Sequence, residues 1–231
     1  MGILRFLIFA AVAIAAFAPV GRADPSGLPS LGSASLLFTL GADDRVVLWA
    51  YDPVSLDLVG GSMLYLPGEV IMRATALATN PVDGRLYAMV FLDGEDASEL
   101  ITLDTATGLA ESIGSTEHLF ASIAFDAAGT LYGVTRLDQE GLDAGELYEI
   151  ETDSGEATLV AELSGDFSAN HAIAFHPSDG KLYHLWGCPA AMESVDIANA
   201  LAVTTISVSG VPVCGVVAIS MGRNRLPARQ P

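Results

Sequence analysis

Short apolar runs alternate with polar turns along the chain from about residue 36, and one arrangement returns several times. Residues 172–187, AIAFHPSDGKLYHLWG, hold two apolar runs joined by a Pro/Asp/Gly turn, and residues 76–90 and 123–135 repeat this arrangement. A leucine followed by an aromatic residue marks the copies at Leu37, Leu86, Leu131 and Leu182. A step of roughly 45 to 50 residues indicates a repeat architecture.

Each copy predicts four short β-strands, which we call strands a to d in chain order. In the copy that begins at residue 123, these strands cover 123–125, 131–134, 147–150 and 157–161. Strand b is apolar at both odd and even positions, which is typical of a sheet covered on both faces. No helical periodicity runs long enough to compete.

The turns have residue types that suit a tight reversal. Side chains that can cap the a–b turn come first, and glycines able to take the left-handed conformation close the a–b and c–d turns. The expected caps are Asn80, Asp126 and His176, and the glycines are Gly84, Gly129, Gly180, Gly108 and Gly155. Leu56 and Ala200 replace the c–d glycine in the outer copies, so we expect those two turns to differ.

The element φAφ-x-P-x-DG-x-LY, followed by φDTxTG, resembles the NHL, YVTN and WD40-like propeller repeats of bacteria over about residues 36–221. This resemblance implies an all-β fold, a small β-propeller of four four-stranded blades. Because such folds host unrelated activities, it implies architecture and not chemistry.

The count of strands suggests how the ring closes. The first copy supplies strands b, c and d, and the missing strand a is found at 216–221, so both chain ends build one blade of a closed monomer. Two alternatives stay open. Half-blades pair between molecules into a dimer or larger ring, or the uncharged residues 200–221, followed by arginines, form a C-terminal anchor.

Residues 1–23 predict a secretory signal, with a basic start, an apolar core and cleavage after Ala23. A linker at 24–34, the propeller domain at 35–221 and a disordered tail at 222–231 follow. The chain is therefore expected to be secreted or periplasmic, without a membrane segment after cleavage. The two cysteines, Cys188 and Cys214, are expected to form a disulfide there, closing a loop of about 25 residues.

The formal net charge of −18 argues against nucleic acid as a partner, because the surface repels phosphate backbones. The expected partner is a protein or a glycan. Acidic b–c loops offer oxygen ligands for Ca²⁺ without the spacing of a known calcium loop, and no other cofactor is expected. These acidic residues are Asp93, Glu95, Asp96, Asp138, Glu140 and Asp143.

Connections from strand d to strand a deliver polar side chains to the axial mouth of a propeller. Five such residues are candidates for binding or acid–base chemistry: Arg73, Glu117, His118, Asn170 and His171. His184 replaces Ala88 and Gly133 in strand b, which predicts a packing role.

Three functions follow from these observations. The favoured one is an exported, non-catalytic propeller that acts as a binding or scaffold module through its acidic loop face. The second is an enzyme of the lyase, hydrolase or dehydrogenase type at the axial mouth, and the third is a purely structural surface component. Hydrolase, metalloprotease and nucleotide-binding motifs are absent from the sequence, which favours the first and third.

Overall fold

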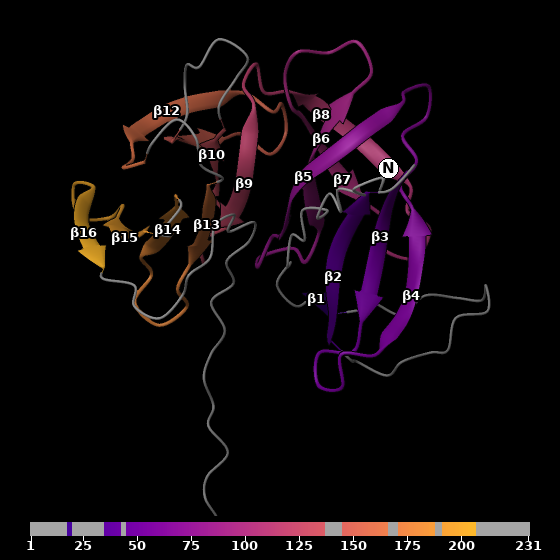
Figure 1. Ribbon diagram of the computed structural model, residues 1–231, viewed down its shortest axis with the longest axis horizontal. Helices are drawn as coiled ribbons and strands as arrows, with labels where there is room; N and C mark the ends of the chain where they lie inside the picture. The colour runs from indigo at the N-terminus through magenta and orange to yellow at the C-terminus, as the bar shows by residue number, and fades with distance from the viewer. Residues whose placement is uncertain are drawn as a thin grey trace, which may run out of the picture.

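The computed structural model describes residues 18–19, 35–42, 45–136, 145–165, 171–187 and 191–206. These residues form sixteen β-strands and no helix, and so no helix that could span a membrane. The strands make four antiparallel four-stranded sheets, arranged as a four-bladed β-propeller (Figure 1). The predicted fold class is confirmed.

The four blades follow one another along the chain. The first contains β1 (Ala18–Pro19), β2 (Ser35–Ala42), β3 (Val46–Tyr51) and β4 (Leu58–Met63). The second contains β5 (Ile71–Thr79), β6 (Leu86–Leu92), β7 (Glu99–Leu103) and β8 (Ala110–Ser115). The third contains β9 (Phe120–Phe125), β10 (Leu131–Thr135), β11 (Glu146–Ile150) and β12 (Ala157–Glu162). The fourth contains β13 (Ala172–Phe175), β14 (Leu182–Trp186), β15 (Ala191–Asp196) and β16 (Ala202–Ile206).

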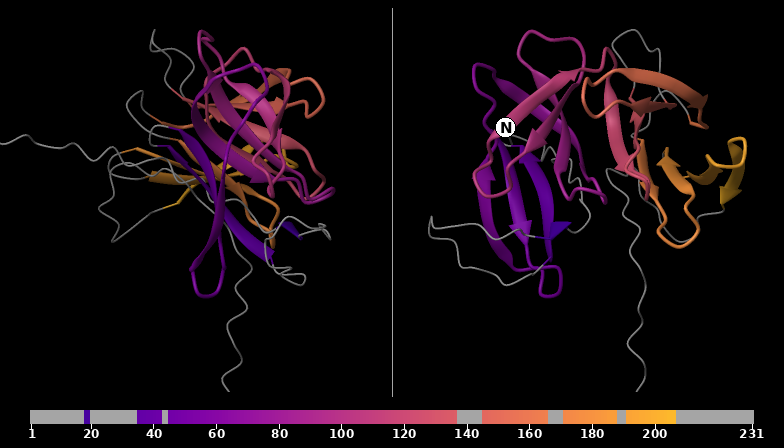
Figure 2. Two further views of the ribbon diagram at one scale, coloured as in Figure 1. Left: turned by 90° about the vertical axis from the view of Figure 1, so that its right-hand side faces the viewer. Right: turned by 180° about the vertical axis from the view of Figure 1, so that it is seen from behind.

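The inner strands β5, β9 and β13 lie side by side around the centre of the molecule, where β5 contacts β9 and β9 contacts β13, and β5 also contacts β2 of the first blade (Figures 1 and 2). Side chains join them across the blades. The Thr75 hydroxyl donates to the Phe120 carbonyl at 2.9 Å, and the Ser122 hydroxyl accepts from Ile173 N at 3.2 Å. These bonds join β5 to β9 and β9 to β13 directly.

The hydrophobic core is divided into three clusters, each filled from two adjacent blades. Strand β6 shows why, since all seven of its side chains are buried: the even-numbered ones face the first blade, and Tyr87 and Met89 face the third. A strand covered on both faces needs apolar side chains at every position, as the sequence of strand b predicted.

Two of the three predicted turn caps are present. Asn80 Oδ1 accepts from Val82 N at 2.9 Å, and Asp126 Oδ1 accepts from Ala128 N at 2.9 Å. His176 does not cap its turn, because its Nδ1 instead lies 3.3 Å from Asp179 Oδ1.

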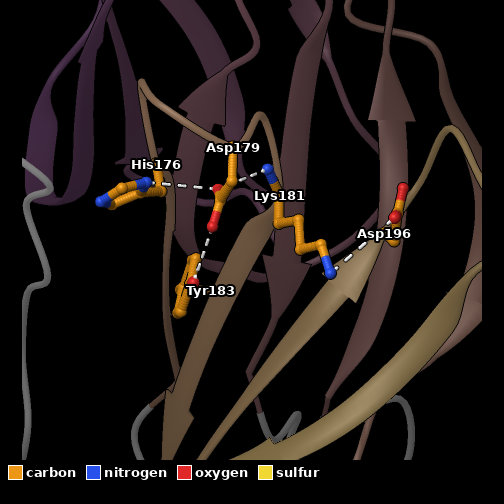
Figure 3. A network of polar contacts seen from close by, with 5 residues as sticks. All are labelled: His176, Asp179, Lys181, Tyr183 and Asp196. Carbon is orange, nitrogen blue, oxygen red and sulfur yellow. Dashed lines mark hydrogen bonds and ion pairs between the residues drawn. The ribbon is translucent and has the colours of Figure 1, made fainter.

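Asp179 is the centre of the polar network at the turn of the fourth blade (Figure 3). Its carboxylate accepts from the Tyr183 hydroxyl at 2.9 Å and from Lys181 N at 3.1 Å, while Lys181 Nζ lies 3.9 Å from Asp196. Asp179 therefore orders this turn as Asp83 does in the second blade, where Asp83 Oδ1 accepts from Arg85 N at 2.9 Å.

Glycines of the c–d turns have a second function at the contact between blades. Gly155 has a φ of +81°, and a Cβ placed there would lie 2.7 Å from the carbonyl oxygen of Gly114 in the preceding blade. A Cβ at Gly108 would likewise collide with the Met63 carbonyl of the first blade. Each turn therefore needs glycine both for its conformation and for close contact with the blade before it.

The outer copies show how turns without glycine are built. Leu56 adopts a φ of 60°, and its N donates to Asp52 O as Gly108 N does to Asp104 O, so the prediction of a different turn was wrong here. The side chain of Leu56 is exposed. In the fourth blade the turn does differ, because Ala200 and Leu201 both have positive φ.

The predicted closing strand at 216–221 lies outside the described residues. In the structure the inner edge of β2 pairs with β1, whose Ala18 is opposite Leu36. That edge therefore accepts an antiparallel partner, although β1 lies within the predicted secretory signal. The domain boundaries, the closed monomer and the C-terminal anchor remain predictions.

Candidate functional site

The four blades present two ends, and several of the candidate residues that the structure describes lie at one of them. We call this the loop end: it is where strand b ends, strand c begins, and the chain enters the inner strand. At the loop end Arg73 of β5 is directly opposite Phe91 of β6 in the sheet register. The Cζ atom of Arg73 lies 4.3 Å from the centroid of the Phe91 ring.

A second arginine approaches the same ring from the next blade. Arg136 follows β10, and its Cζ atom lies 5.8 Å from the Phe91 centroid. The backbone of Arg136 is fixed, since its N donates to Leu119 O at 2.8 Å. Arg73, Phe91 and Arg136, which we call the arginine pair with its ring, therefore lie at the seam between the second and third blades.

The arginine pair has no acidic partner among the described residues. Partial burial, and then the positive charge of Arg136, lower the pKa of Arg73 below its ordinary value. Two of the other three described basic side chains have acidic partners: Arg85 lies 3.9 Å from Glu111, and Lys181 lies 3.9 Å from Asp196. Within the described part of the chain, the pair is a local concentration of positive charge.

His118 and Glu117, two of the predicted mouth residues, lie on the same d–a connection but differ in role. The His118 ring packs 4.4 Å from the Tyr148 ring, and its carbonyl accepts from Ser98 N at 2.9 Å. Glu117 is exposed, with a φ of 60°. His118 thus covers the core of the third blade, and Glu117 is directed to the surface.

His171, the other predicted histidine, belongs to a buried polar chain in the fourth blade. Its Nδ1 lies 2.9 Å from His184 Nε2, and His184 Nδ1 lies 3.0 Å from Glu193 Oε1. The two imidazole rings are stacked, and His184 also stacks on Trp186. His184 and Glu193 have no exposed surface, and His171 is 2% exposed.

Ionised Glu193 is the acceptor that orders this chain. Burial opposes its ionisation, but hydrogen bonds from His184 and from Ser164 N, at 3.0 Å, outweigh burial and hold its pKa below the ordinary value. The chain can orient the imidazoles and pass a proton between them. Its burial beneath Trp186 and against Gly165, where a Cβ would lie 2.7 Å from His171 Cε1, favours a structural role.

Sequence reasoning missed Glu193 and Arg136. A signal for Glu193 was present, because His184 and Glu193 are cross-strand partners at the positions where the second blade pairs Ala88 with Ile101. Two polar residues that replace an apolar pair in a covered sheet indicate a buried hydrogen bond. Arg136 gave no such signal, since it simply follows a strand.

The remaining predicted site residues do not meet in the described structure. Asp93, Glu95 and Asp96 are in a loop after β6, and no three acidic, histidine or cysteine side chains among the described residues could hold a metal ion. Asn170, Asp138, Glu140, Asp143, Cys188 and Cys214 lie outside the described residues. The calcium site and the disulfide therefore stay predictions.

Fold and loop end together define a four-bladed β-propeller with a positively charged seam. No family model and no curated protein matches the chain.

Among solved structures, the chain is similar to one from a nidogen/laminin complex, with 13% identity over 77% of this chain and 63% of that one, and a TM-score of 0.55. It is also similar to the hydrazine synthase of Kuenenia stuttgartiensis, with 14% identity over 89% and 53% and a TM-score of 0.53. A protein of unknown function from Bacteroides caccae is also similar, with 10% identity over 87% of this chain and 63% of that one, and a TM-score of 0.50.

The chain thus spans less than two thirds of the length of each of these three. At such low identity the likeness shows the fold alone.

Proposed function

We propose that this chain is an exported, non-catalytic propeller that binds a protein or a glycan through its loop end. One observation carries the proposal: the residues that could perform acid–base chemistry are separated or enclosed, while the charged and apolar side chains of the loop end are accessible. His171 engages His184 in a buried chain, whereas His118 packs on Tyr148. An enzyme would need such groups to meet at a surface that its substrate can reach.

The loop end has the mixed character of a recognition surface. Val70 and Met72, at the entry to β5, are each 60% exposed, and Arg73 follows them. Exposed apolar side chains next to arginine are typical of binding surfaces. The regular hydrogen-bonded turns at the opposite end, which we call the turn end, present short loops that vary less in sequence. Function concentrates on variable loops held by a rigid scaffold.

The test uses the mature protein, residues 24–231, on a glycan array and on an array of immobilised peptides. A saturable ligand is expected, and Met72→Asp should weaken its binding about tenfold or more by placing a charge in the contact surface. Val82→Asp is the matched control, because Val82 is 68% exposed at the turn end. Equal effects of the two substitutions, or no saturable ligand on either array, would contradict the proposal.

A further inference from the structure

We propose that Arg73 and Arg136, held around Phe91, bind the carboxylate group of a ligand at the loop end. This inference rests on the proposed function, because it names the ligand chemistry of the same surface. Both guanidinium carbons lie within 5.8 Å of one ring centroid, and they come from different blades. The contact between the two blades therefore brings together two guanidinium groups, one from each blade.

The arrangement needs an explanation because it is electrostatically unfavourable without an anion. Like charges so close together repel, and the described residues supply no carboxylate to either arginine. Acidic residues outnumber basic ones by 28 to 10 in the whole chain, so pairing would be easy to provide elsewhere on the surface. Phe91 holds Arg73 in place through a cation–π contact, with the guanidinium carbon 4.3 Å from the ring centroid.

The chemistry of the donors favours a carboxylate. A guanidinium presents paired N–H donors that match the two oxygens of a carboxylate or of a phosphate. The formal net charge of −18 penalises a dianion about twice as much as a monoanion, so the carboxylate is the better fit to this protein. Exposed Val70 and Met72 offer apolar contact to the body that carries the carboxylate.

Three sugars that share one ring test the proposal: D-glucose, D-glucuronate and glucose 6-phosphate, observed by saturation-transfer NMR with the mature protein. D-glucuronate should bind, glucose should not, and glucose 6-phosphate should bind more weakly than D-glucuronate. Arg73→Gln or Arg136→Gln should each weaken the binding of D-glucuronate about tenfold. Arg85→Gln is the matched control, because Arg85 precedes the same β6 strand at the turn end.

Several outcomes would overturn the inference. Glucose binding as well as D-glucuronate, no binding of D-glucuronate, or its unchanged binding to the Arg73→Gln/Arg136→Gln double variant would each do so. Binding that emerges only after Asp138→Asn, Glu140→Gln and Asp143→Asn would show that the arginines serve an internal contact. If Met72→Asp weakens the binding of a loop-end ligand but neither arginine substitution does, this inference is wrong and the proposed function is not contradicted. Comparable melting temperatures of the variants exclude unfolding as the cause.

Discussion

Removing the carboxylate of Glu193 tests whether the buried histidine chain stabilises the fourth blade. Glu193→Ala leaves His184 Nδ1 and Ser164 N without the acceptor that both now use, at 3.0 Å each. His184 has no exposed surface, so its donor would be left in a region from which water is excluded. We expect the free energy of unfolding to fall by about 3–5 kcal/mol, the usual cost of removing one partner of a buried pair. Glu193→Gln keeps an acceptor oxygen, so its cost should be about 1–2 kcal/mol.

The pH dependence of this loss has a definite sign. Because the folded pKa of Glu193 is lowered, its ionised form stabilises the protein fully above the unfolded pKa, about 4.3 for glutamate. That stability is lost as the pH falls through the folded pKa. Glu193→Gln does not titrate at this position, so the gap in stability between it and the wild type should narrow on acidification from about pH 4.3 downward.

Urea unfolding followed by tryptophan fluorescence measures both effects. The chain has two tryptophans, and Trp186 stacks 4.9 Å from His184, so a Trp49→Phe background leaves one reporter in the fourth blade. Glu149→Gln is the control, because Glu149 is on the third strand of the neighbouring blade but is exposed. Losses below about 0.5 kcal/mol for both Glu193 variants, or a gap that does not change with pH, would refute the reasoning.

Three further predictions concern the blades and their ends. Gly155→Ala should lower the free energy of unfolding by about 2–4 kcal/mol, because its Cβ meets a backbone carbonyl in a left-handed turn. In the same urea assay, Leu56→Gly should leave the free energy of unfolding unchanged or raise it by up to about 1 kcal/mol, because Leu56 already has a positive φ. Equal losses for the two variants would contradict the turn argument. Truncating the mature protein after residue 206 should lower the melting temperature, whereas truncation after 221 should not, because only the first removes the expected partner of β2; matching melting curves would remove that closing strand. Mass spectrometry of exported protein should find Asp24 as the first residue, and a retained residue 18 would refute signal cleavage there.

The strands could be predicted because the same pattern of apolar runs and turns occurs in several copies along the chain. Strand β6, for example, is apolar at every position, and only a doubly covered strand explains that in so short a run. The left-handed turns were predicted where glycine marks them. Leu56 was misjudged because a turn tolerates about 1 kcal/mol of backbone strain when its hydrogen bonds are made and its side chain is in solvent.

The candidate site was harder to predict because it is made between blades. Arg73 was identified from its connection, but its partner Arg136 lies 63 positions later and is brought to Phe91 only by the packing of two sheets. The chain from His171 to Glu193 depends on strand register, which the sequence leaves open by a residue or two. His184 and Glu193 are both polar at inward positions of paired strands. Placing them opposite each other would have given the register and the buried chain together.

The glycine contacts between blades give the repeats a direction that their sequences conceal. A copy whose c–d turn has Gly108 or Gly155 can be placed after any blade that offers an open carbonyl to receive it. The copy with Leu56 cannot be placed there, because a side chain at that position would collide with a backbone carbonyl of the preceding blade. A gene duplication that doubled the second or third copy would therefore yield a longer array that still stacks, whereas one that doubled the first would not. The copies share one sequence pattern, but their order along the chain cannot be exchanged freely.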